Sequence, residues 1–273
     1  KTDAAKAGRD KTIWFFISVI TLIYLYLVVV FFGYPGIIFE SAFFQPGIYA
    51  SLTFSSLGHV WIFVVLLFML TLLFYWFFNR GRALQSLLRY TVPVLLLVLA
   101  SLSFAFAHQL GKSLIIDSTI SFEAYKLNSI STYTFIGLLI LLMANMVFLL
   151  LLDKALVLLN GPCKWGSYIW IALVVVGAQI PFLFTGFWQT EAVTLLFLLG
   201  MVVALIYLRT RRARLKLSRF IVIILLLTFY FTHDLQKHTS EKFAAQKEIE
   251  LAKLSSEHDA VAEMLFADLS DQL

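Results

Sequence analysis

The sequence predicts an all-α fold: a polytopic transmembrane helical bundle of about seven spans, followed by an amphipathic helical stalk. The first observation behind this prediction is composition, because 61% of the 273 residues are hydrophobic and only 14% are charged, with a mean hydropathy of +0.90. Water-soluble domains of this length do not have such a composition. The second is a series of apolar runs of about membrane-crossing length. The third is an unequal distribution of Lys and Arg among the connecting segments.

The predicted spans follow from the length that a helix needs to cross a bilayer. About 20 apolar residues cover roughly 30 Å of hydrocarbon. The seventh run, "FIVIILLLTFYFT", is the shortest, with 13 residues before His233 and Asp234. It either crosses as a short span or lies partly in the interface. In chain order the predicted spans are residues 13–32, 60–78, 90–107, 134–152, 167–187, 192–208 and 220–232.

The distribution of basic residues predicts the orientation of the bundle. The N-terminal tail and the second, fourth and sixth connections together hold fifteen Lys and Arg, whereas the first, third and fifth connections hold only Lys112 and Lys126. Cytoplasmic segments of membrane proteins are enriched in Lys and Arg. We therefore expect a cytoplasmic basic tail over residues 1–12, a transmembrane bundle over 13–235 and an extracytoplasmic stalk over 236–273. The same reasoning explains the net charge of +5, because the basic residues orient the spans and do not indicate nucleic-acid binding.

The basic segment "RTRRARLKLSR" directly precedes the seventh run. Orientation of that run, with snorkelling of the long side chains, is favoured over specific binding of anionic lipid. The predicted topology anchor consists of Arg209, Arg211, Arg212, Arg214, Lys216 and Arg219.

The fifth predicted span contains residues that disfavour a continuous helix. Gly177, Gln179 and Pro181 either break the helix and expose backbone groups, as in discontinuous transporter helices, or form a packing kink with one interhelical hydrogen bond. The second interpretation is favoured, because Pro and Gly are common in spanning helices. Ionisable residues are almost absent from the predicted spans, which argues against a site for a transported charge.

The chain contains no recognisable motif for catalysis or cofactor binding. Its only cysteine is Cys163, and no Cys or His residues have metal-ligand spacing, so we expect no catalytic, cofactor-binding or metal residues. In the third connection, a short extended stretch is expected around residues 114–122. His108, Asp117 and Glu123 lie near it and are either an ion or solute site or solvated loop charges, and the second interpretation is favoured because their spacing is not specific for a site.

Residues 236–273 have the pattern of an amphipathic helix. Apolar residues recur at spacings close to three, four and seven, with Glu and Lys between them. A short stalk that leads into a folded module is favoured over a long coiled coil, because His258 interrupts the apolar seam. Ser255 or Ser256 is expected to cap a second helix and so to introduce a joint. The predicted face of the stalk helix consists of Leu251, Leu254, Val261 and Leu265.

Three segments carry a resemblance to a known family. They are "IYASLTFSSLGHV", "KSLIIDSTISFEAYKLNSISTYTFIGLLI" and "EIELAKLSSEHDAVAEMLFADL", in this order along the chain. Together they resemble the membrane sensor region of large, multi-span bacterial sensor histidine kinases of two-component systems. The resemblance implies a truncated chain, in which the stalk begins an extracytoplasmic sensor domain that leads to a further span and a cytoplasmic kinase.

The resemblance also implies the remaining properties of the full-length protein. It would be a homodimer in the bacterial cytoplasmic (inner) membrane and an ATP-dependent protein-histidine kinase that uses ATP and Mg and passes phosphate to a cytoplasmic response regulator. Two alternatives come from other classes. One is a transporter or permease-like protein, with buried polar groups around Asn145 and Gln179, and the other is a membrane structural or assembly protein whose helix docks on an envelope partner.

Overall fold

The computed structural model describes residues 2–33, 36–51, 53–78, 91–120, 122, 131–159, 165–181, 192–210 and 216–270. Over these residues the fold is all-α, as predicted, with no β-strand and one isolated antiparallel bridge between Tyr49 and Ser118. The elements are α1 (Thr2–Phe32), α2 (Gly36–Phe39), η1 (Ala42–Phe44), α3 (Leu57–Phe78), α4 (Thr91–Ile116), α5 (Thr132–Leu158), α6 (Trp165–Gly177), α8 (Ala192–Thr210) and α9 (Lys216–Ser270).

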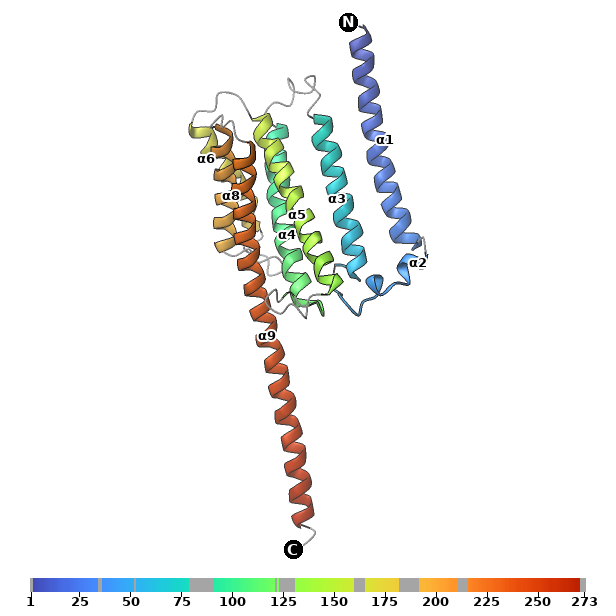
Figure 1. Ribbon diagram of the computed structural model, residues 1–273, viewed down its shortest axis with the longest axis vertical. Helices are drawn as coiled ribbons and strands as arrows, with labels where there is room; N and C mark the ends of the chain where they lie inside the picture. Colours follow the sequence, from blue (N-terminus) through green and yellow to red (C-terminus); the bar gives the residue numbers. More distant parts are fainter. Residues whose placement is uncertain are drawn as a thin grey trace.

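The helices form a bundle with a long projection (Figure 1). Helices α3, α4 and α5 lie side by side, and α4 packs most extensively against α5. Helix α1 contacts α3 at one side of the bundle, while α6, α8 and the first part of α9 lie at the other side. The two termini lie at opposite ends of the molecule.

Four of the described helices are long and apolar enough to cross a membrane: Ile13–Phe32, Leu57–Phe77, Thr91–Ile116 and Thr132–Leu158. They indicate a membrane protein. The predicted number of about seven spans is not confirmed. The apolar part of α8, Val193–Tyr207, is shorter than these four helices. The fifth predicted span runs into residues outside the described part of the chain, and the seventh forms part of α9.

Two predicted helix ends were wrong, because helices continue beyond their apolar runs. Helix α4 extends to Ile116 instead of residue 107, so the first part of the expected extended stretch is helical. Leu110, Leu114 and Ile115 are buried at helical spacing, and their packing stabilises these additional turns. Helix α5 likewise extends to Leu158, beyond the predicted end at residue 152.

The core consists of two hydrophobic clusters that share α4. One includes Phe104, Phe148 and Leu198 and packs α4 and α5 against α6, α8 and α9. The other includes Leu57 and Leu114 and packs the C-terminal half of α4 against α3, α5 and the segment after η1. These clusters bring α9 against α4 along the side of the bundle.

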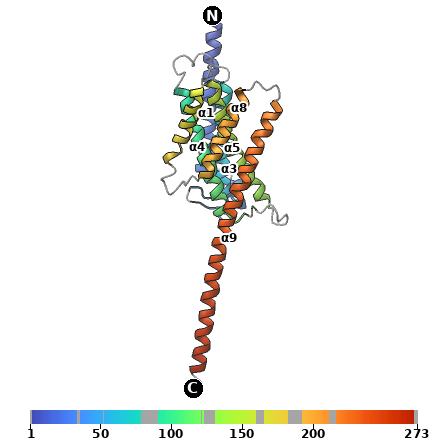
Figure 2. The ribbon, with the colours of Figure 1, turned by 90° about the vertical axis from the view of Figure 1, so that its left-hand side faces the viewer.

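Helix α9 belongs to the bundle in its first part and projects from it in its second part (Figure 2). It is 55 residues long, which corresponds to about 80 Å at 1.5 Å per residue. The helix continues through Ser255 and Ser256, so the joint predicted there was wrong. The local capping signal has not ended the helix, which continues with good helix formers such as Glu257 and Ala260.

Candidate functional site

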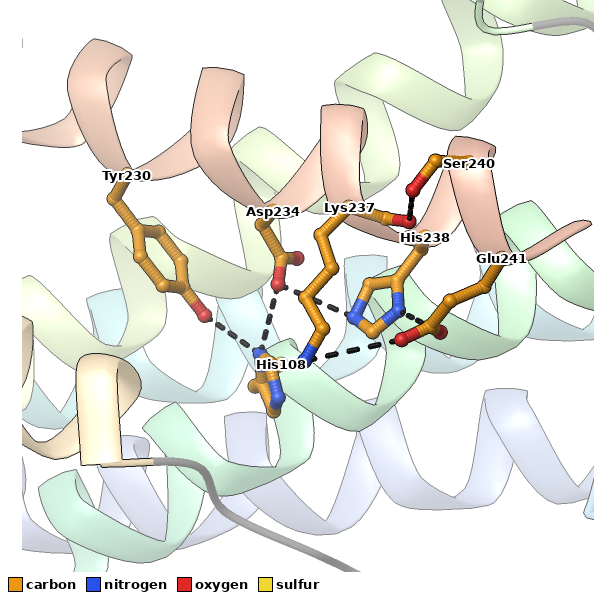
Figure 3. A network of polar contacts seen from close by, with 7 residues as sticks. All are labelled: His108, Tyr230, Asp234, Lys237, His238, Ser240 and Glu241. Carbon is orange, nitrogen blue, oxygen red and sulfur yellow. Dashed lines mark hydrogen bonds and ion pairs between the residues drawn. The ribbon is translucent and has the colours of Figure 1, made fainter.

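A cluster of polar side chains joins α4 to α9 where α9 leaves the bundle (Figure 3). His108 comes from α4, while Tyr230, Asp234, His238 and Glu241 come from α9. His108, Asp234 and His238 are all buried, with His238 only 1% exposed. Burial of ionisable groups is unfavourable unless they are paired, so the contacts among these side chains determine what the cluster can do.

The spacing along α9 places the cluster on one face of the helix. Tyr230, Asp234 and His238 follow one another at intervals of four residues, and such residues lie on the same face. On the facing helix, Gly111 has no side chain, and a Cβ atom there would lie only 3.3 Å from Asp234 Oδ2. The missing side chain lets the carboxylate approach α4 closely.

The Asp234 carboxylate lies between two imidazoles. Its Oδ1 atom is 3.2 Å from His108 Nδ1 and 3.3 Å from His238 Nε2. The Tyr230 hydroxyl is 2.8 Å from His108 Nδ1. On the far side of the second imidazole, His238 Nδ1 is 2.9 Å from Glu241 Oε2. One continuous chain of polar contacts therefore connects α4 to two successive turns of α9.

These contacts change the protonation of the groups on α9 beyond the predicted span. Burial alone would raise the pKa of Asp234, but contact with His108 and His238 and their charge outweigh it and lower this pKa to about 2. Burial would lower the pKa of His238, but Asp234 and Glu241 outweigh it and raise it. Contact with His238 lowers the pKa of Glu241. The arrangement favours two carboxylates around a positive charge.

His238 Nε2 is the unusual atom of the cluster. It is buried and makes no hydrogen bond of good geometry with any described residue; Asp234 Oδ1, 3.3 Å away, is its ion-pair partner. Most buried polar atoms have a hydrogen-bond partner, so such an exception requires an explanation.

A lysine reinforces the junction one turn further along α9. Lys242 Nζ donates hydrogen bonds to the backbone oxygen of Ser118, at 2.6 Å, and to that of Ile120, at 3.4 Å. Burial lowers the pKa of Lys242. The segment that follows α4 is therefore attached to α9 through carbonyl groups that no helix uses.

The polar residues predicted in the fifth span lie at the end of α6. The helix ends at Gly177, and the buried Gln179 donates from Nε2 to the backbone oxygen of Ser101, at 2.6 Å, and to its Oγ, at 2.7 Å. Ser101 Oγ in turn donates to Val175 O at 2.8 Å. Pro181 is exposed, and Asn145 is buried, with its Nδ2 bonded to Leu141 O of its own helix.

The other predicted residues lie apart from this cluster. Among the proposed topology anchors, Arg211, Arg212 and Arg214 lie outside the described residues; Arg209 is near the end of α8, and Lys216 and Arg219 are in the first turn of α9. On the predicted stalk face, Leu251 and Leu254 are exposed. Val261 and Leu265 belong to α9, but their side chains lie outside the described part of the structure.

Two interpretations of charged residues were wrong. His108 was interpreted as a solvated loop residue and is a buried residue of α4. Lys154 follows the fourth predicted span, which ends at residue 152, and was therefore among the fifteen basic residues assigned to cytoplasmic segments. It is buried in α5, with Nζ 4.7 Å from the centre of the Tyr75 ring. Both errors have the same cause, because the helices continue past their apolar runs. The spacing of Tyr230, Asp234 and His238 was the available signal for the cluster.

Comparison with protein families, curated proteins and solved structures gives no match to the chain. The site must therefore be interpreted from its own chemistry.

Proposed function

We propose that this chain is the membrane-integral input module of a signalling protein, of the sensor histidine kinase type that its sequence resembles. The observation that carries this proposal is the continuity of α9, because one helix both packs in the bundle and forms the stalk. In a continuous helix, a shift or rotation at the bundle reappears at the far end. The kinase domains would be elsewhere in the full-length protein.

The polar cluster supplies the bistable element that such a module needs. Packed helices change between discrete arrangements rather than deform continuously, and a signal must favour one of them by a few kcal/mol. The contact of Asp234 with His108 is a discrete connection between α4 and α9, and it is either formed or broken. A membrane or envelope condition that alters this contact would change the position of α9 and hence of the stalk.

The topology in this proposal follows the distribution of basic residues. The N-terminal tail is cytoplasmic, and the stalk is outside the cytoplasmic membrane of a bacterium. The position of the two termini at opposite ends of the bundle supports an odd number of passes. A homodimer, a cytoplasmic response regulator, and ATP and Mg in the kinase domain complete the proposal.

The decisive experiment concerns the reading frame and its product. The proposal requires a frame that continues beyond Leu273 into a further span, a His-containing helix and an ATP-binding domain. Membrane vesicles with the full-length protein should then incorporate label from γ-labelled ATP into an acid-labile phosphohistidine. A frame that ends shortly after Leu273 would rule out phosphorylation by this polypeptide.

A second experiment tests the topology separately. A reporter that is active only outside the cytoplasm should be active when fused after Ser270. Neutral replacement of Arg209, Arg211, Arg212 and Arg214 should decrease its activity, because these residues are the proposed anchor of the last span. Replacement of Lys112 and Lys126, the two basic residues of the outer connections, is the matched control and should not decrease it.

Transport is the second candidate. The sequence argued against it because ionisable residues are almost absent from the predicted spans, whereas the buried cluster of His108, Asp234 and His238 favours it. Ionisable residues in a membrane bundle often bind or relay a transported charge. However, a cavity of about 340 Å³ among α3, α4 and α5 is lined almost entirely by apolar side chains, such as Phe63, Leu102 and Val147. Proteoliposomes with a pH-sensitive dye separate the candidates, because transport requires a flux that His108→Gln abolishes and the sensory proposal requires none.

A further inference from the structure

The contacts of His238 determine which of its nitrogen atoms carries a proton. An ionised carboxylate only accepts hydrogen bonds, so His238 Nδ1, which is 2.9 Å from Glu241 Oε2, must be the donor. In the neutral imidazole, Nε2 then carries a lone pair. This lone pair is 3.3 Å from a carboxylate oxygen of Asp234, and both groups are buried. A positive charge between these two atoms removes their repulsion, and either a proton on Nε2 or a metal ion can supply it.

A nitrogen of a second histidine lies next to the same Asp234 carboxylate. His108 Nδ1 is 3.2 Å from Asp234 Oδ1, and the ligand atoms of the three residues all lie within 4.8 Å of one another. In a tetrahedral zinc site with bonds of 2.0–2.1 Å, neighbouring ligand atoms are roughly 3.3 Å apart. The two nitrogen-to-oxygen distances have this value, so a small movement of the imidazoles suffices to surround an ion.

We propose that His108, Asp234 and His238 bind one divalent transition-metal ion of the zinc class. Glu241 would orient His238 by accepting a hydrogen bond from Nδ1–H, as carboxylates commonly do for metal-binding imidazoles. The convergence of three buried ligand atoms from two helices is the observation that carries this proposal. The inference concerns binding alone and does not depend on the proposed sensory function.

The ligand types select the class of ion. Two imidazoles with one carboxylate suit zinc, copper, nickel or iron, whereas Mg²⁺ and Ca²⁺ prefer oxygen ligands. Three protein ligands leave a fourth position open. The Tyr230 hydroxyl lies 2.8 Å from His108 Nδ1. When Nδ1 binds the ion, its contact with this hydroxyl is lost. A bound ion would hold α4 and α9 together at the base of the stalk.

The test uses the untagged chain in lipid nanodiscs, treated with a chelator and then dialysed against Zn²⁺. We expect one bound zinc per chain, unaffected by excess Mg²⁺. Asp234→Asn and His238→Gln should each weaken binding more than tenfold. His233→Gln is the matched control, because His233 is an exposed histidine next to Asp234 on the same helix, and this variant should bind zinc normally.

A spectroscopic measurement on the unaltered chain keeps the test decisive if the buried variants fail to fold. Co²⁺ in place of zinc should give the intense d–d absorption of a tetrahedral site. Glu241→Gln, at a side chain that is 44% exposed, should fold and weaken zinc binding about tenfold. The proposal is overturned if the unaltered chain binds no zinc, or gives only the weak absorption of octahedral Co²⁺. It is also overturned if zinc binding is lost with His233→Gln but retained in a folded Asp234→Asn variant.

Discussion

Two buried polar sites lie on α4, seven residues apart, and they differ in kind. Ser101 faces the end of α6, where it bonds to Val175 O and to Gln179 Nε2. His108 faces α9 and belongs to the cluster with Asp234 and His238. Among the described residues, the first site, the α4–α6 site, contains only neutral groups. The second, the α4–α9 site, contains ionisable groups from two helices that are far apart in the sequence.

The difference shows when an unpartnered buried atom indicates a binding site. Both sites contain one, namely Gln179 Oε1 at the α4–α6 site and His238 Nε2 at the α4–α9 site. Among the described residues, however, only the α4–α9 site brings together three His, Cys, Asp or Glu side chains close enough to share an ion. A single unpartnered atom lowers stability slightly, whereas convergence of several ligand atoms on one point defines a place for a cation.

The largest expected effect is on the α4–α9 site, through Asp234→Ala. This change leaves two buried imidazoles without their shared carboxylate, and removal of one partner of a buried ion pair costs about 3 kcal/mol. Thermal unfolding of the metal-free chain in detergent should show this loss. Glu248→Ala removes an exposed acid from the same helix and should stay within about 0.5 kcal/mol. Equal effects of the two variants would mean that α9 is held by apolar packing alone.

The next effect is the pH dependence of the metal-free chain. The folded-state pKa of Asp234 is about 2, below its ordinary value of 3.8, so the unfolded chain binds more protons between these values. Stability is therefore complete above about pH 4 and falls by about 2 kcal/mol towards pH 2. His238 acts at the other end, since its raised pKa gives stability that is complete below 6.5 and lost as the pH rises through the folded value.

Other charged groups near the cluster are Lys112, Lys237 and Glu241, so the comparison must isolate Asp234. The stability of Asp234→Asn, measured by unfolding between pH 2 and pH 5, should not show the fall towards pH 2 that is expected of the unaltered chain. Gln179→Leu, at the α4–α6 site, should keep the loss of stability at low pH, because the described residues of that site are all neutral. If the unaltered chain and the two variants lose the same stability towards pH 2, the loss comes from groups outside the α4–α9 site.

Much of the fold was predictable because composition and apolar length are local properties. The all-α class and the membrane character followed from them directly. The ends of α4 and α5 were not predictable in this way, because burial of Leu110 or Lys154 depends on packing against other helices. The same reason explains the joint predicted at Ser255, where continuation of the helix was not visible in the capping signal alone.

The α4–α9 site was missed for a related reason. Metal-ligand spacing within one segment reveals only local sites, whereas His108 and Asp234 are 126 positions apart. The signal within α9, a Tyr, an Asp and a His at intervals of four, needed a helix that continues beyond the apolar run. The fifth predicted span, by contrast, was marked by Gly177, Gln179 and Pro181 themselves, so its polar residues could be named from the sequence.

A smaller effect is expected at the α4–α6 site. Gln179→Leu removes the hydrogen bonds to Ser101 but also removes the unpartnered Oε1 atom, and Leu fills a similar volume. The net loss should be about 1 kcal/mol, because a typical buried hydrogen bond contributes about that much. Thermal unfolding measures it, and zinc binding should remain unchanged. Weaker zinc binding in this variant would show that the two sites on α4 are coupled.

The smallest expected effect tests how closely α9 approaches α4. In a helix interior, replacement of Gly by Ala stabilises by about 1 kcal/mol. Gly200→Ala, in α8, should give such a gain, because no described residue outside the neighbouring backbone of α8 lies within 4 Å of its added Cβ. Gly111→Ala should give about 0.5 kcal/mol less, because its Cβ would lie 3.3 Å from Asp234 Oδ2 and displace a carboxylate that two imidazoles hold. Paired thermal unfolding curves of the two variants measure this difference. Equal gains would mean that Asp234 moves freely, and the α4–α9 site would then be too loosely arranged to bind an ion tightly.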